Sequence, residues 1–229
     1  MKDVLDILGN KKTITRQKLL QEHTCYLTGV IEDTEHYLDL FETLKTANAG
    51  DLVKIVIDCY GGSVATGYVI VQHIIEAIES GVEVVAVIGK NCCSMATVIP
   101  MYCTDLELFP WSNMLIHSGT EGHYGALNEN KKTVEFSFKE GEKDLRRDYE
   151  FFLTEEEINR LVDNAEPLLL DSDDIKERWI RKIEMSNGLS GEDNSIQLED
   201  LIAEIVDKRL EEKSKPTPKK KTPTKKTAK

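Results

Sequence analysis

Long hydrophobic segments are missing from this sequence. No run of apolar residues approaches the roughly 18 that span a bilayer, and no secretory signal pattern is present near residue 1. Cysteine is scarce as well, and the count of five is odd, so the thiols cannot all pair within the chain. These absences predict a protein of the reducing cytoplasm, with free thiols and no membrane contact.

Patterns that bind metals or phosphates are also missing. Cys92 and Cys93 are adjacent, and no two cysteines of the chain have the spacing of a zinc site. No glycine-rich loop ending in Lys and Ser or Thr is present, so the chain has no nucleotide-phosphate loop of its own. We therefore expect neither a metal nor another cofactor.

Acidic residues are absent from the last segment, residues 213–229, which contains eight lysines. The other residues contribute 21 Lys and Arg against 41 Asp and Glu, so an acidic body precedes a basic tail. Pro, Thr and Lys without apolar residues predict disorder. The tail is either a solubilising segment that neutralises its own body, or an arm that touches an acidic partner or nucleic acid nonspecifically. It has no aromatic residue, which argues against specific nucleic-acid recognition.

Short apolar, β-branched segments alternate with segments of helical periodicity. We expect strands at 25–31, 52–60, 82–89, 106–109 and 113–117. Between them, apolar residues recur at helical spacing after Thr34 and again from Val64 to Gly81. This alternation predicts an α/β fold with parallel crossovers and helices that cover the sheet.

The expected domain limits follow from these patterns. A flexible N-terminal segment occupies 1–23, one domain spans 24–190, a C-terminal helix follows at 191–212, and the disordered tail is 213–229. Within the domain, residues 127–153 are highly charged, with periodic apolar residues such as Leu145, Tyr149 and Phe152. We interpret them as helices outside the compact sheet that pack on another element, such as a second subunit.

Three predicted strand ends carry groups suited to acyl transfer. They are the pair Gly61 and Gly62, then Ser94, then His117, and such ends gather at one edge of a parallel sheet. A serine becomes a nucleophile when an imidazole takes its proton, and main-chain N–H groups stabilise the resulting oxyanion. Gly62 and Met95 are the candidate donors.

Each group also has a simpler interpretation on its own. The glycine pair is a turn, Ser94 a helix N-cap, and His117 a hydrogen-bonded core or surface histidine. Cys93 is an alternative nucleophile, but a reactive thiolate needs an electropositive, partly exposed site, and its side chain should point away from the turn. The joint placement at successive strand ends favours a serine site.

Four segments resemble successive signatures of the proteolytic subunit of the Clp protease, a serine endopeptidase. They are CYLTGVIED, IDCYGGSVATG, CCSMATV and PWSNMLIH, between Cys25 and His117, and the likeness extends more loosely to Asp174. The resemblance implies the Clp protease and crotonase fold, with repeated β-β-α and β-α-β units and a protruding helical handle. It also implies that Ser94 is the nucleophile, His117 the general base, and Gly62 and Met95 the oxyanion donors.

The sequence departs from that family at several places. Tyr60 stands where the family has Pro, and Cys92 and Cys93 replace small Ala residues. The catalytic acid of the family falls on Glu166 or Pro167, depending on a shift of one residue. We choose Glu166 as the third catalytic residue, with Asp163 and Asp171 as alternatives. If none reaches His117, a Ser–His dyad or a non-cleaving relative results.

The resemblance further implies an assembly. Its members form two stacked heptameric rings that enclose the active sites, and a hexameric ATP-driven unfoldase threads unfolded polypeptide into them. Residues 127–153 match the contact between the rings, and ATP would bind the partner. A crotonase-like acyl-CoA enzyme and a catalytically silent ring subunit or scaffold are the competing hypotheses. The family's closing segment is missing, which indicates a divergent member, for example one encoded by a phage.

Overall fold

The computed structural model describes residues 20–119 and 127–187 of the chain. The first 19 residues, the predicted C-terminal helix at 191–212 and the tail at 213–229 lie outside the described residues. The chain divides into two units, residues 1–183 and 184–229. The second unit contributes only the end of one helix to the described part, so the fold below is that of the first.

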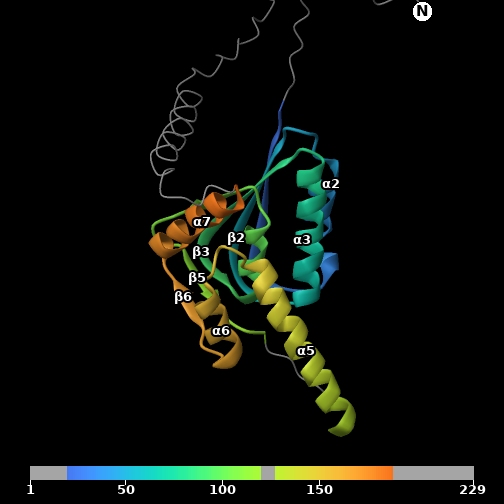
Figure 1. The fold of residues 1–229 in the computed structure, drawn as a ribbon. Coiled ribbons are helices and arrows are strands. Elements are labelled where there is room, and N and C mark those ends of the chain that lie inside the picture. The colour runs from blue at the N-terminus through green and yellow to red at the C-terminus, as the bar shows by residue number, and fades with distance from the viewer. Residues whose placement is uncertain (1–19, 120–126, 188–229) are drawn as a thin grey trace, which may run out of the picture. The chain divides into compact units, whose positions relative to one another are not determined.

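The centre of the fold is a six-stranded sheet (Figure 1). Five strands follow the order β1-β2-β3-β5-β6, and β4 pairs with the part of β3 that precedes its pairing with β5. All neighbouring strands run parallel except β5 and β6, which are antiparallel. The strands are β1 (Glu22–Ile31), β2 (Leu52–Gly62), β3 (Glu83–Cys93), β4 (Asp105–Leu108), β5 (Asn113–Ile116) and β6 (Leu168–Leu170). The predicted α/β fold is confirmed.

Helices follow most of the strands. They are η1 (Thr34–Tyr37), α2 (Leu38–Thr46), α3 (Val64–Glu79), η2 (Ser94–Thr97), α4 (Val98–Met101), α5 (Leu127–Asp148), α6 (Glu155–Asp163) and α7 (Ser172–Ser186). Figure 1 shows α2 and α3 side by side along one side of the sheet, and α5 extending away from it. In the described ranges, none of the helices combines the length and the hydropathy that a membrane span requires.

The core lies between β2, β3 and α3. Ile55 and Ile57 of β2 are fully buried, as are Ile70 and Ile74 of α3. Their β-branched side chains favour the extended conformation in the strand, while spacing of four residues places the two helical ones on one face. Burying each side chain stabilises the fold by about 1.5–3 kcal/mol. This core holds the carboxyl ends of β2 and β3 next to each other.

The predicted strand boundaries differ from the structure by up to four residues, and the largest differences are in β1 and β3. β1 begins at Glu22, three residues before the predicted strand, because its first residues pair with β2 from Leu52 onward. β3 continues through Cys92 and Cys93, four residues beyond its predicted end at residue 89, because β5 pairs with both cysteines. The nucleophile candidate therefore follows the strand directly.

The charged helix α5 also ends earlier than its periodicity predicts. It stops at Asp148, so Tyr149 and Phe152 lie in the turn that follows. Phe151 has a φ of 62°, a left-handed conformation that a continuing helix does not allow. Both Tyr149 and Phe152 are buried, which explains why they look like members of an apolar helical face.

Glu157 links α6 to α7. It forms a capping box with Thr154 at the start of α6, and its carboxylate accepts hydrogen bonds of 2.7 and 2.8 Å from Arg178 of α7. Burial alone would raise the pKa of Glu157, but the hydrogen bonds from Arg178 and Thr154 outweigh it and lower that pKa to about 2. The ionised carboxylate therefore stabilises the fold.

We expect Glu157→Gln to lower the free energy of unfolding at pH 7 by about 2 kcal/mol, because Arg178 loses its charged partner. The pKa of Glu157 is depressed on folding, so its contribution is present above the unfolded-state pKa and is lost as pH falls toward 2. Urea unfolding at pH 7 and pH 3 should therefore show a smaller difference from wild type at pH 3. The exposed neighbour Glu156, changed to Gln, is the control, and an equal loss at both pH values would contradict the prediction.

Candidate active site

Ser94 occupies a sharp turn between β3 and η2. Cys93 is still extended, with φ −125° and ψ 148°, whereas Ser94 has a φ of 54°. A left-handed conformation at a residue with a side chain costs on the order of 1–3 kcal/mol, and such residues cluster at functional sites. The cap position of η2 is Cys93, so the N-cap interpretation of Ser94 does not hold. A strained serine between a strand and a helix is the geometry that exposes a nucleophilic Oγ.

Of the two glycines at the end of β2, Gly61 lies directly against this turn and Gly62 lies against β1. Gly61 has a φ of 88° and Gly62 a φ of 144°. A methyl group added at Gly61 would lie 2.5 Å from Ser94 Cβ, and one added at Gly62 would lie 2.3 Å from the carbonyl oxygen of Ile31. Both positions therefore require glycine, because the backbone approaches too closely for any side chain. A simple turn would not need this contact with the serine.

Met95 fixes the other side of the turn. Its N–H belongs to the first turn of η2, where N–H groups have no partner within the helix. Its side chain packs against α3, since a methyl group at Gly67 would lie 2.4 Å from Met95 Cγ. A methyl group added at Gly61 would lie 3.1 Å from Met95 N, so Gly61 and this N–H border the same space. Donors from two main-chain segments around one space are what an oxyanion hole requires.

His117 comes from the neighbouring strand. β3 and β5 are parallel neighbours, and Cys93 lies opposite Leu115. Neighbouring strands are about 4.8 Å apart, so the ends of β3 and β5, which Ser94 and His117 follow, lie next to each other. The short helix η2 contacts both β2 and β5. No hydrogen bond joins Ser94 to His117 in the part of the chain that the structure describes. Such bonds are often formed only when substrate binds.

The imidazole of His117 has a defined tautomer. Its Nδ1 lies 2.7 Å from the carbonyl oxygen of Ser118. A carbonyl only accepts hydrogen bonds, so Nδ1 carries the proton and donates it. Nε2 then holds the lone pair, and this is the nitrogen that a general base uses against a serine.

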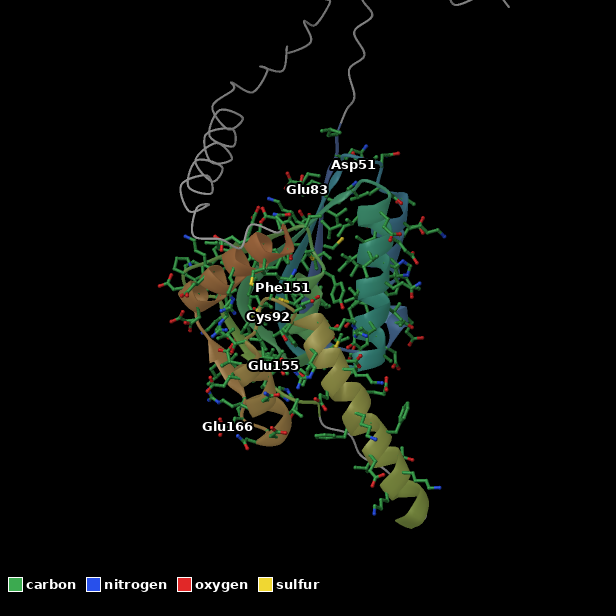
Figure 2. The ribbon with its side chains drawn as sticks, in the orientation of Figure 1. Asp51, Glu83, Cys92, Phe151, Glu155 and Glu166 are labelled. Atoms are coloured by element: carbon green, nitrogen blue, oxygen red, sulfur yellow. The ribbon has the colours of Figure 1, made fainter. Side chains whose placement is uncertain are left out.

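The three candidate acids have other surroundings or partners in the structure. Glu166 accepts a hydrogen bond of 3.0 Å from Arg160 in an exposed ion pair, and Figure 2 shows it far from Cys92 of β3. Asp171 accepts from the N–H groups at the start of α7, and Asp163 is exposed at the end of α6. Among residues 20–119 and 127–187, no hydrogen bond or ion pair connects any of them to His117. The choice of a carboxylate stays a prediction.

The adjacent cysteines are packed rather than activated. Cys92 is fully buried and its Sγ lies 3.2 Å from the carbonyl oxygen of Ala96. Burial raises the pKa of the half-buried Cys93 thiol, and raises that of Cys92 further, so both stay protonated at neutral pH. This disfavours Cys93 as a nucleophile. The described ranges contain no group of three or more His, Cys, Asp or Glu side chains that could bind a metal ion, so neither cysteine is part of such a group there.

Thr97 and Tyr149 support the turn, and sequence reasoning missed both. The hydroxyl of Thr97 donates to the carbonyl of Ser94 at 2.6 Å. The proton of Thr97 is thereby used, so the hydroxyl of Tyr149, 2.5 Å away, donates to Thr97. Tyr149 is buried, and its polar role has no signature in the sequence beyond a periodic aromatic residue.

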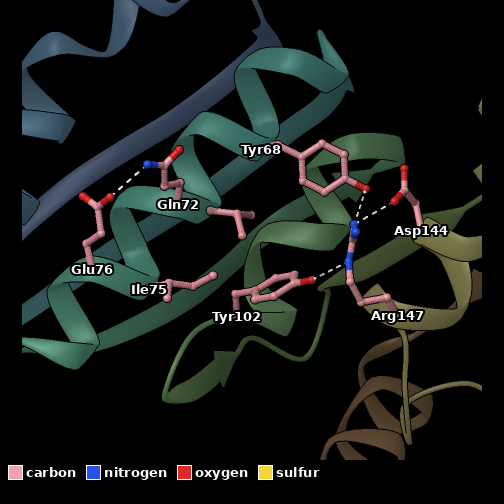
Figure 3. Close-up of a pocket in the computed structure, with 8 residues that line it drawn as sticks. Tyr68, Gln72, Ile75, Glu76, Tyr102, Asp144 and Arg147 are labelled. Atoms are coloured by element: carbon pink, nitrogen blue, oxygen red, sulfur yellow. Dashed lines mark hydrogen bonds and ion pairs between the residues drawn. The ribbon is translucent and has the colours of Figure 1, made fainter. Parts of the chain in front are cut away.

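The residue before Tyr149 anchors the end of α5. Asp148, itself buried, accepts hydrogen bonds of 2.7 Å from both Tyr68 of α3 and Tyr102. Arg147 donates to both hydroxyls and pairs with Asp144, as Figure 3 shows. A cavity of about 660 Å³ lies along α3, and its lining includes Tyr68, Tyr102, Asp144 and Arg147. The base of α5 is therefore held in place beside the nucleophile turn.

Comparison with known proteins gives one family match. A model described as Clp protease matches residues 9–155 of the chain. The matched range includes Ser94, His117 and both glycines, and it ends before Asp163, Glu166 and Asp171. No curated protein matches the sequence.

Proposed function

Because the chain belongs to the Clp protease family, we propose that it is a serine endopeptidase that cleaves unfolded polypeptides through an acyl-enzyme. The observation that carries the proposal is the strained Ser94, packed against Gly61, with His117 directly after the adjacent strand β5. A purely structural serine has no need of a left-handed φ or of this close approach.

The mechanism uses groups of this chain alone. His117 Nε2 takes the proton of Ser94, and Oγ attacks the carbonyl carbon of the peptide bond. The N–H groups of Gly62 and Met95 donate to the oxyanion of the tetrahedral intermediate. His117 then gives its proton to the leaving amine, and water attacks the acyl-enzyme with the same assistance.

We also propose that the active chain is a homo-oligomer of stacked heptameric rings that receives substrate from an ATP-driven unfoldase. The support lies in α5, whose Val134, Phe136 and Phe138 are exposed on an otherwise charged helix. Exposed aromatic side chains so close together favour a protein partner. All five thiols are free, which fits the reducing cytoplasm.

The competing acyl-CoA hypothesis explains less of the site. An enzyme of that type would use the main-chain oxyanion donors but would not need the strained Ser94 or the oriented His117. A silent subunit would need neither the open Nε2 of His117 nor the two left-handed glycines.

A fluorophosphonate probe tests the proposal on the full-length protein. We expect one adduct per chain, mapped by peptide mass to Ser94, and no labelling after unfolding in urea. The matched control is Cys93→Ala, one residue earlier in the same turn, which should be labelled at the wild-type rate. An unlabelled native protein, or an adduct at Cys93 or elsewhere, would contradict the proposal.

A further inference from the structure

We propose that the main-chain carbonyl of Ser118, and not a carboxylate, orients His117, so that the chain works with a Ser94–His117 dyad. The inference rests on the proposed function and specifies how its base is positioned. Ser118 is thus a positioning residue, since its carbonyl acts on substrate only through His117.

The first observation is the hydrogen bond of His117 itself. Its Nδ1 donates to Ser118 at 2.7 Å, which is a short distance for an N–H donor. In a catalytic triad the acid accepts this same Nδ1 proton, fixes the tautomer and stabilises the imidazolium. The position that an acid would occupy is already taken by the carbonyl.

The second observation is the register of β5 and β6. Ile116 lies opposite Leu168, and Leu115 opposite Leu169, in an antiparallel pair. Continued by one residue, this register places Pro167 opposite His117. Opposite residues of antiparallel strands have Cβ atoms about 4.5–5.5 Å apart on the same face. The residue best placed to reach the imidazole is therefore a proline, which has no carboxylate.

The third observation concerns Glu166. Glu166 lies two residues before β6 begins at Leu168, and its neighbour Ala165 has a φ of 50°, so the extended pairing with β5 does not continue to Glu166. The carboxylate of Glu166 is held by Arg160 at 3.0 Å, and the main-chain N–H of Glu166 donates to the carbonyl of Arg160. The carboxylate of Glu166 therefore has Arg160, and not His117, as its hydrogen-bond partner.

The chemistry of such a dyad is balanced without an acid. The proton of Ser94 moves to Nε2 of His117, and Nε2 then gives it to the leaving amine as the peptide bond breaks, while the Nδ1 proton stays in its bond to Ser118. In deacylation, Nε2 takes a proton from the attacking water and returns it to Ser94 Oγ as the ester bond breaks. The carbonyl sets the correct tautomer, as a carboxylate would. It offers the imidazolium only a dipole instead of a full charge, so the reaction is slower than in a complete triad.

Neutral substitutions of the three acids give the first test. We expect Glu166→Gln, Asp163→Asn and Asp171→Asn to keep the fluorophosphonate labelling rate of the full-length protein within about threefold of wild type. A loss of about 100-fold in any one of them, with an unchanged unfolding transition, would overturn the inference, because that carboxylate would then be the third catalytic residue.

Pro167→Asp gives the second test, since it places a carboxylate opposite His117. We expect the labelling rate to rise about tenfold, while the uncharged Pro167→Asn stays at the wild-type rate. No increase in folded Pro167→Asp would count against the register on which the inference depends.

A spectroscopic reading separates this inference from the proposed function. In protein labelled with 15N-histidine at pH 8, the His117 signals, assigned with His117→Gln, should show the proton on Nδ1. The same should hold in Ser94→Ala and Glu166→Gln. A proton on Nε2, or a tautomer that changes in Glu166→Gln, would overturn the inference. An Nδ1 proton in a protein that no probe labels would instead leave the positioning intact and refute the peptidase.

Discussion

Ser94→Ala is expected to lower kcat/KM for a fluorogenic unfolded peptide by roughly 10⁵–10⁶. The variant lacks the oxygen that forms the acyl-enzyme, and only the oxyanion donors and substrate binding remain to assist water. The main-chain turn should persist, because Ala is smaller than Ser and Gly61 of β2 packs against the Cβ that both residues share. The measurement is steady-state peptide hydrolysis, with thermal unfolding to confirm that the variant folds.

Cys93→Ala is the matched control for this loss. It changes the neighbouring residue of the same turn, and its thiol stays protonated because burial raises its pKa. Its kcat/KM should stay within about threefold of wild type. More than about 1% residual activity in Ser94→Ala would show that another group is the nucleophile.

His117→Ala is expected to lower kcat/KM by roughly 10⁴–10⁶, nearly as much as loss of the serine, since the two residues act as a unit. Without Nε2, nothing accepts the Ser94 proton, and the hydroxyl is a poor nucleophile. The double variant Ser94→Ala, His117→Ala should be no slower than either single variant. This non-additivity distinguishes a shared chemical step from two separate structural defects.

The control for His117→Ala is His36→Ala. His36 lies in η1, and its side chain is half exposed in a pair with Glu32. Its removal should leave peptide hydrolysis unchanged. If His117→Ala lost less than tenfold, a different base would have to serve Ser94.

The strands, and the placement of the glycine pair, Ser94 and His117 at strand ends, could be predicted because their signals are local. β-branched runs mark the strands, and paired glycines and a small-residue turn mark two of their ends. The left-handed φ of Ser94 could not be predicted in this way, since a serine before small residues also fits an N-cap. The structure decides between the two because the approach of Gly61 involves a residue 33 positions away in the sequence.

The position of the acid could not be settled from the sequence for a different reason. Three consecutive leucines, 168–170, fit a short strand in more than one register, and a shift of one residue exchanges Glu166 for Pro167. Only the pairing with β5, which places Ile116 opposite Leu168, fixes the register from which Pro167 is inferred to lie opposite His117. In the same way, Tyr149 looked like one more apolar residue of a helix, and its hydroxyl acquires a role only because α5 ends before it.

Two hydrogen bonds, from Tyr149 to Thr97 and from Thr97 to the carbonyl of Ser94, connect the end of α5 to the nucleophile turn. Tyr149 directly follows the anchored end of α5, so the helix cannot shift along its axis without breaking this chain or displacing the main chain of the serine. A partner that binds Phe136 and Phe138, which are exposed in the middle of α5, would therefore also act on the main chain of Ser94 through this helix. In the proposed assembly, a contact on α5 would be coupled to the reactivity of Ser94 through three groups: the hydroxyl of Tyr149, the hydroxyl of Thr97 and the carbonyl of Ser94.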